Sequence, residues 1–124
     1  GLVAELPEPM AELDFLRFLK EKMRAGSVRY TRLTGRKVQK VAICGGSGSF
    51  LLKNTILAGA EVFITADFKY HQFFDAEGAL VIADIGHFES EQYTIELIHD
   101  LIVEKFATFA VRLTEVNTNP VAYL

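Results

Sequence analysis

The sequence has a single cysteine, Cys44, and no tryptophan among its 124 residues. One thiol excludes an internal disulfide, and cysteine usage of this kind is typical of a reducing compartment, so we expect a cytoplasmic protein. No apolar run approaches the roughly 20 residues that a membrane-spanning helix needs, and we expect no membrane association. The formal net charge of −3 provides no basic face, so nucleic acid is not an expected partner.

The residues that are present indicate a folded domain. Hydrophobic residues make up 50% of the chain, which is enough for a modest apolar core. The length allows one domain, so we treat residues 1–124 as a single lobe. The opening segment, GLVAELPEPM, starts with Gly1 and resembles the interior of a polypeptide, so we expect this lobe to be a piece of a longer parent protein.

The pattern of apolar residues predicts alternating helices and strands. Pro7 and Pro9 indicate an initial loop. We expect helices at about 10–24, 50–58, 71–77 and 87–106. We expect strands at 27–32, 40–44, 61–65, 79–85 and 109–116. This alternation is typical of an α/β fold with a layered sheet.

Three polar clusters each follow a predicted strand. Residues 45–49 (GGSGS) follow the strand that ends at Cys44, residues 65–71 (TADFKYH) follow the next, and residues 84–91 (DIGHFESE) follow the third. In open α/β sheets the ligand site lies at the carboxyl ends of the strands. The sequence therefore predicts that these clusters converge on one site.

His87 and Glu91 are four residues apart in a predicted helix, so their side chains point the same way and can bind one ion. Imidazole nitrogen and carboxylate oxygen suit zinc, iron and manganese. The alternative is that Glu89, Ser90 and Glu91 only provide a cap and an acidic first turn, with His87 exposed beside them. Spacing alone favours this alternative, because two ligands fall short of a tight metal site.

Asp67 and His71 repeat the four-residue spacing, so Asp67 could orient a ligand or water and His71 could transfer a proton. Spacing alone favours the alternative, in which Asp67 caps the short helix that contains His71. The amides of the GGSGS loop, around Gly46 and Ser47, could bind an anion. That loop is not a Walker A motif, and Leu51 stands where a dinucleotide fingerprint needs its third glycine.

Four segments together resemble the Nif-three-like family, whose members are often described as GTP cyclohydrolase type 2 homologues. The segments are GLVAELPEPM, VAICGGSGSF, EVFITADFKYHQFFDA and IADIGHFESEQ. Their order and spacing are similar to the C-terminal half of that family. One departure is Ala66, where the family usually has glycine.

The resemblance implies a fold of two α/β lobes around a cleft with two divalent metal ions. It implies that His87 and Glu91 are metal ligands, and that Asp67, His71, Gly46 and Ser47 lie nearby, behind the ligands or facing a substrate. The family's other metal ligands come from an N-terminal lobe that this chain does not contain. We therefore expect the missing lobe as a partner, self-association through exposed apolar surface, and little or no activity from the isolated chain.

Two functions from different classes remain open. The parent could be a metal-dependent hydrolase-like protein that acts on a nucleotide, with two metal ions activating water. It could instead be a metal-binding scaffold or regulatory protein without catalysis. A nucleotide-binding module without a metal is a third possibility.

Overall fold

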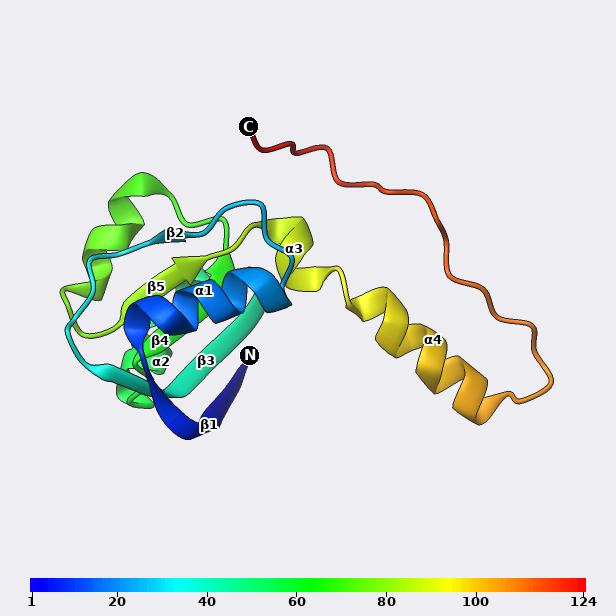
Figure 1. The fold of residues 1–124 in the computed structure, drawn as a ribbon, viewed down its shortest axis with the longest axis horizontal. Helices are drawn as coiled ribbons and strands as arrows, with labels where there is room; N and C mark the ends of the chain where they lie inside the picture. The colour runs from blue at the N-terminus through cyan, green and yellow to red at the C-terminus, as the bar shows by residue number, and fades with distance from the viewer.

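A computed structural model describes all residues, 1–124, as a five-stranded sheet with helices on both faces (Figure 1). The strands are β1 (Leu2–Ala11), β2 (Arg29–Tyr30), β3 (Lys37–Ser47), β4 (Val62–Ala66) and β5 (Val81–Asp84). The α-helices are α1 (Glu12–Lys22), α2 (Leu52–Leu57), α3 (His87–Glu91) and α4 (Thr94–Lys105), and the 3₁₀ helices are η1 (Ser49–Leu51) and η2 (Tyr70–Ala76). The α/β layered fold expected from the sequence is confirmed.

The sheet order is β1-β3-β4-β5-β2. Strands β3, β4 and β5 run parallel, while β1 and β2 are antiparallel edge strands. Parallel pairing brings the carboxyl ends of β3, β4 and β5 to the same edge. The three polar clusters therefore do converge, as the sequence predicted.

Alternation along the parallel strands supplies one core on each face of the sheet. On one face, Val62 and Ile64 of β4 pack with Phe15 and Leu16 of α1. On the other, Phe63 packs with residues of α2 and of the segment around η2. Burying a side chain of this size contributes about 1.5–3 kcal/mol, so these two cores stabilise the parallel strands against both helix layers.

The initial loop predicted from Pro7 and Pro9 is wrong, because these residues lie within β1. Proline lacks an N–H group and is tolerated only where a strand needs no donor. The ladder between β1 and β3 is interrupted between Glu5 and Met10, which is the part of β1 that contains both prolines. An edge strand with an interrupted ladder can therefore accommodate them.

The single helix predicted for 87–106 is also wrong, because it divides into α3 and α4 at Gln92 and Tyr93. The Gln92 amide donates to the Glu89 and Met23 carbonyls at 3.1 and 2.6 Å. The Tyr93 hydroxyl donates to the Lys22 carbonyl at 2.9 Å. These bonds attach the break to the end of α1 and occupy a carbonyl that a continuous helix would use.

The strand predicted for 109–116 does not form. After α4 the chain continues as an extended arm, residues 106–124, which pairs with no other strand and returns toward α3 (Figure 1). A strand requires a neighbour for its backbone N–H and C=O groups, and the arm forms no ladder with either edge strand. The strand predicted for 27–32 is shortened to the two residues of β2 for a similar reason, since only Arg29 and Tyr30 pair with β5.

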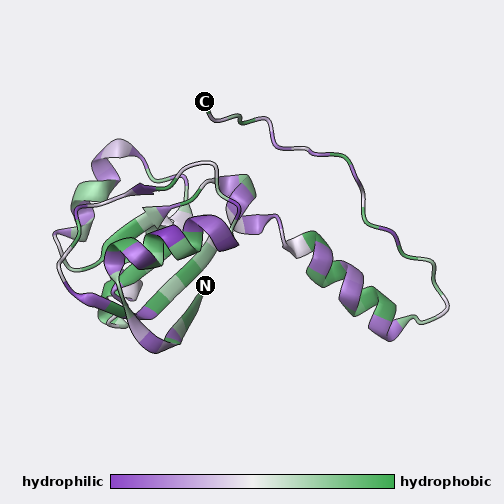
Figure 2. Ribbon diagram, viewed as in Figure 1, coloured by the Kyte–Doolittle hydropathy of each residue, from purple (hydrophilic) through white to green (hydrophobic).

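Helix α4 projects from the body, and hydrophobic residues alternate with hydrophilic ones along its length (Figure 2). Leu97, Ile98 and Leu101 are each at least half exposed. No other element of the chain covers them. None of the helices combines the length and the apolar character that crossing a membrane would require.

Glu12 joins α1 to the turn before β3. Its carboxylate is 5% exposed and accepts hydrogen bonds from Thr34 N, Thr34 Oγ1 and Gly35 N at 2.9, 2.5 and 2.9 Å. Burial by itself raises the pKa of Glu12, but these hydrogen bonds and the charge of Arg36 outweigh it and hold that pKa below its ordinary value. The charged form of Glu12 therefore stabilises the fold.

We predict that Glu12→Gln lowers the free energy of unfolding by about 1–3 kcal/mol. The pKa of Glu12 is lower in the folded than in the unfolded state, so its contribution is present above the unfolded pKa and is lost as pH falls through the folded pKa. Urea unfolding at several pH values measures both effects. The exposed Asp14→Asn is the control, and equal losses for the two variants would contradict the prediction.

Candidate functional site

The site lies at the sheet edge where β3, β4 and β5 end. Helix α3 starts directly after β5 and packs against β3 and β4. Asp67 follows β4, and the glycine-rich loop follows the apolar part of β3. The sheet topology thus brings the GGSGS loop, Asp67 and the first residue of α3 into contact.

Asp67 and His87 form the closest side-chain contact of the site. Asp67 Oδ2 lies 2.6 Å from His87 Nδ1, although the residues are 20 positions apart. Asp67 reaches this position with φ of 61°, a left-handed conformation that aspartate tolerates better than most residues. Gly86, with φ of 95°, makes the turn that places His87 at the start of α3.

Glu91 lies on the other side of the same imidazole. Its Oε2 is 3.3 Å from His87 Nε2, as the four-residue helical spacing predicted. His87 is therefore held between two carboxylates, with its side chain 56% exposed. The hydrogen bond with Asp67 raises the pKa of His87 above its ordinary value; partial burial opposes this, and the negative charges of Asp67 and Glu91 reinforce it.

The GGSGS loop closes over this pair at Gly46. A Cβ atom at Gly46 would lie 2.7 Å from Glu91 Oε1 and 3.2 Å from His87 Cε1, and the backbone there has φ of 64°. The Gly46 N–H donates to Ser90 Oγ at 2.8 Å, and the Gly46 carbonyl accepts from Thr65 Oγ1 at 3.0 Å. The Gly46 amide is thus already used inside the protein and is not free for an anion.

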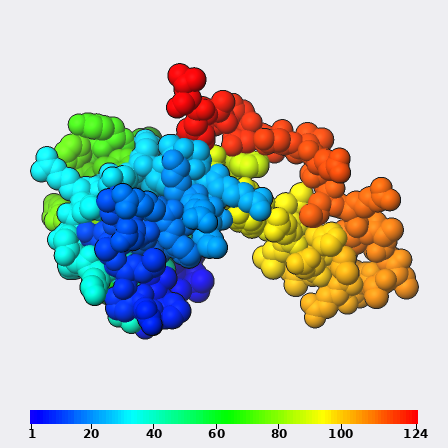
Figure 3. Space-filling model, viewed as in Figure 1, coloured from blue at the N-terminus to red at the C-terminus, as the bar shows by residue number.

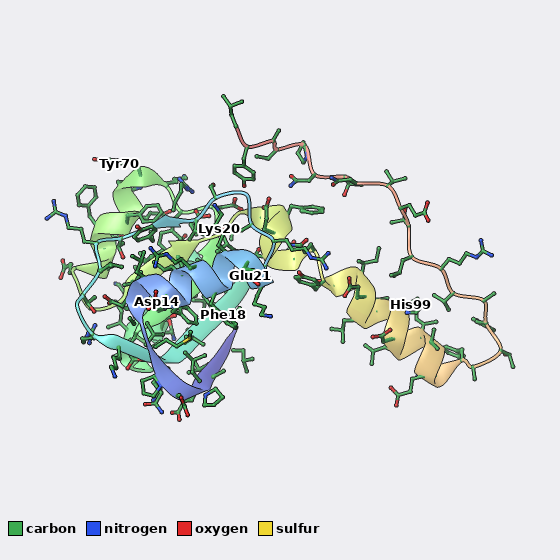
Figure 4. All side chains as sticks on the ribbon, in the orientation of Figure 1. Asp14, Phe18, Lys20, Glu21, Tyr70 and His99 are labelled. Carbon is green, nitrogen blue, oxygen red and sulfur yellow. The ribbon has the colours of Figure 1, made fainter.

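The remaining predicted residues lie outside this contact set. Ser47 is exposed at the end of β3, in register with Ala66 of β4. His71 is exposed in η2, one residue from Tyr70 (labelled in Figure 4), and it makes no side-chain hydrogen bond. Asp67 does not cap η2, whose N-cap residue is Lys69. The spacing of Asp67 and His71 therefore does not bring their side chains together, because the two residues are not on one helix.

A cleft of about 1090 Å³ opens beside the site, between the body and the C-terminal arm (Figure 3). Its lining includes Asp67, His87 and Glu91. On the arm side, Asn119 Nδ2 donates to the buried carboxylate of Glu89 at 3.2 Å. The cleft gives a small molecule access to the exposed side of His87.

The donor set of this lobe is incomplete for a metal ion. No group of three or more His, Cys, Asp or Glu side chains is arranged to hold one. The reason is visible in the geometry, because Asp67 and Glu91 contact opposite nitrogens of one ring. His87 Nε2 and Glu91 can face a common ion, whereas Asp67 can only orient the ring.

Sequence reasoning missed three residues that hold the site together. Ser90 links α3 to the GGSGS loop, and Arg29 donates to the carboxylate of Asp84 at the end of β5. A signal for Asp84 was available, because it is a charged residue inside the apolar run 79–85. Ser90 and Arg29 had no such signal, since their partners are distant in sequence.

We predict that Asp67→Asn lowers the pKa of His87 toward its ordinary value, because the largest cause of the increase is removed. Because the pKa of His87 is higher in the folded than in the unfolded state, protonated His87 stabilises the fold at pH values below its unfolded-state pKa. This stabilisation is lost as the pH rises through the folded-state pKa of His87. NMR titration of the His87 ring measures the change, with the ring signals of His99 as an internal control. An unchanged His87 titration would contradict the observed contact.

Gly46→Ala should disturb the site, whereas Gly35→Ala should not. Both glycines have positive φ, so each substitution costs about 1–2 kcal/mol of backbone strain. Only Gly46 also faces His87 and Glu91, whereas Gly35 faces open space. We expect a larger stability loss in Gly46→Ala than in Gly35→Ala, and displaced His87 ring NMR signals in Gly46→Ala alone; equal His87 spectra in the two variants would contradict the contact.

Comparison with known proteins agrees with the family resemblance and with the fold. Residues 1–120 match the family Duf34/NIF3 (NGG1p interacting factor 3). A GTP cyclohydrolase 1 type 2 homolog of Staphylococcus aureus is 32% identical over 129 residues, which cover 100% of this chain and 35% of that protein. The chain thus spans about a third of the length of the curated relatives it matches.

Solved structures give the same result. A crystal structure of a Staphylococcus aureus protein superposes with a TM-score of 0.84 at 28% identity, covering 98% of this chain and 41% of that one. The crystal structure of a Bacillus cereus protein related to NIF3 superposes with a TM-score of 0.83 at 26% identity, covering 100% of this chain and 36% of that one. The chain belongs to the DUF34/NIF3 family.

Proposed function

We propose that this chain supplies two ligands, His87 and Glu91, to a dinuclear divalent-metal site in a hydrolase-like protein that acts on a nucleotide. The observation that carries the proposal is the position of the His87 ring. Asp67 occupies Nδ1, which leaves Nε2 directed toward Glu91 and the cleft. In metal-binding histidines one ring nitrogen usually donates to a carboxylate while the other faces the metal ion.

The chemistry of the donors supports zinc, iron or manganese. Without a metal ion, His87 Nε2 can donate a hydrogen bond to the Glu91 carboxylate only when this nitrogen carries a proton. The raised pKa of the ring agrees with this, because it favours the doubly protonated imidazole. A divalent cation would take the place of that proton between the nitrogen and the carboxylate. The remaining ligands would come from an N-terminal lobe outside this chain, and two ligands alone would leave the isolated chain without appreciable hydrolase activity.

Bound metal ions would supply an activated water molecule and would neutralise negative charge on the substrate. The residues of this chain would hold and orient the metal ion. His87 and Glu91 would bind it, Asp67 would fix the orientation of the His87 ring, and the lack of a side chain at Gly46 leaves room for the side chains of His87 and Glu91. The name of the Staphylococcus aureus relative, a GTP cyclohydrolase 1 type 2 homolog, supports a nucleotide as the substrate class. The adjacent cleft has room for a molecule of that size.

A second candidate function is a metal-binding scaffold. The exposed apolar side chains of α4 favour it, because surfaces of this kind are typical of protein contacts. The missing lobe or a second copy of the chain could cover them. The two candidates differ at the metal: a hydrolase keeps an exchangeable water on the ion, whereas a structural site is closed by protein ligands.

We predict that the chain binds Mn²⁺ weakly and that His87→Ala or Glu91→Ala abolishes this binding. Mn²⁺ titration followed by paramagnetic broadening of NMR signals measures the affinity and locates the ion. Binding should weaken as pH falls through the raised pKa of His87, because the proton competes for Nε2. The matched control is His99→Ala on α4, far from the site (Figure 4).

Unchanged Mn²⁺ affinity in both site variants would contradict the ligand assignment. Equal loss in His99→Ala would show that the ion binds elsewhere and would contradict it as well.

A further inference from the structure

Asp84 is a buried carboxylate that no proposed metal role uses. It ends β5 with 3% exposure, and it accepts hydrogen bonds from three segments of the chain. The Arg29 guanidinium and the Phe68 N–H donate to Oδ2, the latter at 2.9 Å, and the Gly86 N–H donates to Oδ1 at 3.2 Å. All of the donors that surround this carboxylate therefore come from β2 and from the two loops of the site.

The two backbone donors are the direct neighbours of the residues that form the central contact. Phe68 follows Asp67, and Gly86 precedes His87. Each loop also has a left-handed backbone at this point, with φ of 61° at Asp67 and 95° at Gly86. One carboxylate thus holds both of the strained turns that bring Asp67 and His87 within 2.6 Å of each other.

Arg29 completes the arrangement. Its guanidinium also donates to the Phe68 carbonyl at 3.0 Å, so Arg29 and Asp84 together bind the backbone carbonyl and the backbone N–H of Phe68. The guanidinium lies 5.4 Å from the centre of the Phe73 ring in η2. These contacts orient Asp84 and leave it little freedom to move.

Stability alone does not explain a charge at this position. Replacing a buried ion pair by well-packed apolar residues is often neutral or stabilising, because desolvation opposes the Coulomb attraction. A carboxylate can accept from several backbone N–H groups at once, and an apolar side chain cannot. The specific contribution of Asp84 is therefore geometric.

We propose that Asp84 is a positioning residue, which sets the distance between Asp67 and His87 and through it the direction of His87 Nε2. The part of this inference that concerns metal affinity depends on the proposed function; the part that concerns the His87 ring does not. Because a displacement of about 1 Å is enough to impair a binding site, loss of the Asp84 hydrogen bonds should affect the site beyond its effect on stability.

The test is Asp84→Asn, with Glu12→Gln as its matched control. Glu12 is also a buried carboxylate with three hydrogen bonds, but it lies at the opposite end of β3, where the strand begins. The first readout is the ¹⁵N spectrum of the His87 ring at about pH 9, well above the ordinary pKa of histidine. The second is Mn²⁺ affinity, and the third is the free energy of unfolding.

We expect Asp84→Asn to shift His87 from the form with hydrogen on Nδ1 toward the form with hydrogen on Nε2, and to weaken Mn²⁺ binding about 10- to 100-fold. Glu12→Gln should lower stability and leave both site readouts unchanged. Wild-type ring signals in Asp84→Asn, or the same ring shift in Glu12→Gln, would overturn the proposal.

Arg29→Lys provides a second variant if Asp84→Asn does not fold. Lysine keeps the charge but cannot bind Asp84 and the Phe68 carbonyl with a planar fork, so we expect a smaller ring shift in the same direction. No shift in a folded Arg29→Lys variant would overturn the proposal. Absence of Mn²⁺ binding in the wild-type chain would contradict the proposed function, whereas the ring spectrum would still decide the role of Asp84.

Discussion

Parallel pairing of β3, β4 and β5 is the constraint on which the rest of the lobe depends. A parallel sheet needs cover on both of its faces. Helix α1 covers one face, and α2 and η2 cover the other. Parallel pairing also forces the three strands to end at one edge. The three central side chains of the candidate site, Asp67, His87 and Glu91, come from segments that follow β4 and β5, so the apolar core decides which polar groups can meet.

The contacts at that edge depend on local backbone conformations with positive φ, and the packing of the core offsets the free energy that they cost. Asp67, Gly46 and Gly86 all have positive φ. Each of these turns is tied by a hydrogen bond to a neighbouring segment, through Asp84 or Ser90. The result is a rigid imidazole between two carboxylates, beside a cleft that is open to small molecules.

Much of this fold could be predicted because the parallel strands are short apolar runs bounded by glycine and polar residues. The helical spacing of His87 and Glu91 was equally informative, since it depends only on one turn of helix. The contact between Asp67 and His87 could not be predicted from spacing, because it requires a left-handed residue after β4. Pro7 and Pro9 concealed β1, since their effect on a strand depends on whether a partner needs their N–H groups. The exposure of the apolar side chains of α4 could not be predicted either, because helical periodicity does not show whether another element covers the apolar face.

The central claim is that His87 Nε2 and Glu91 face one divalent cation while Asp67 holds the other side of the ring. A crystal of the chain equilibrated with Mn²⁺, with anomalous scattering recorded at the manganese edge, tests it most directly. The account predicts an anomalous peak bound by His87 Nε2 and the Glu91 carboxylate, with Asp67 still on Nδ1. A peak bound without His87, or no peak at this edge of the sheet, would contradict it.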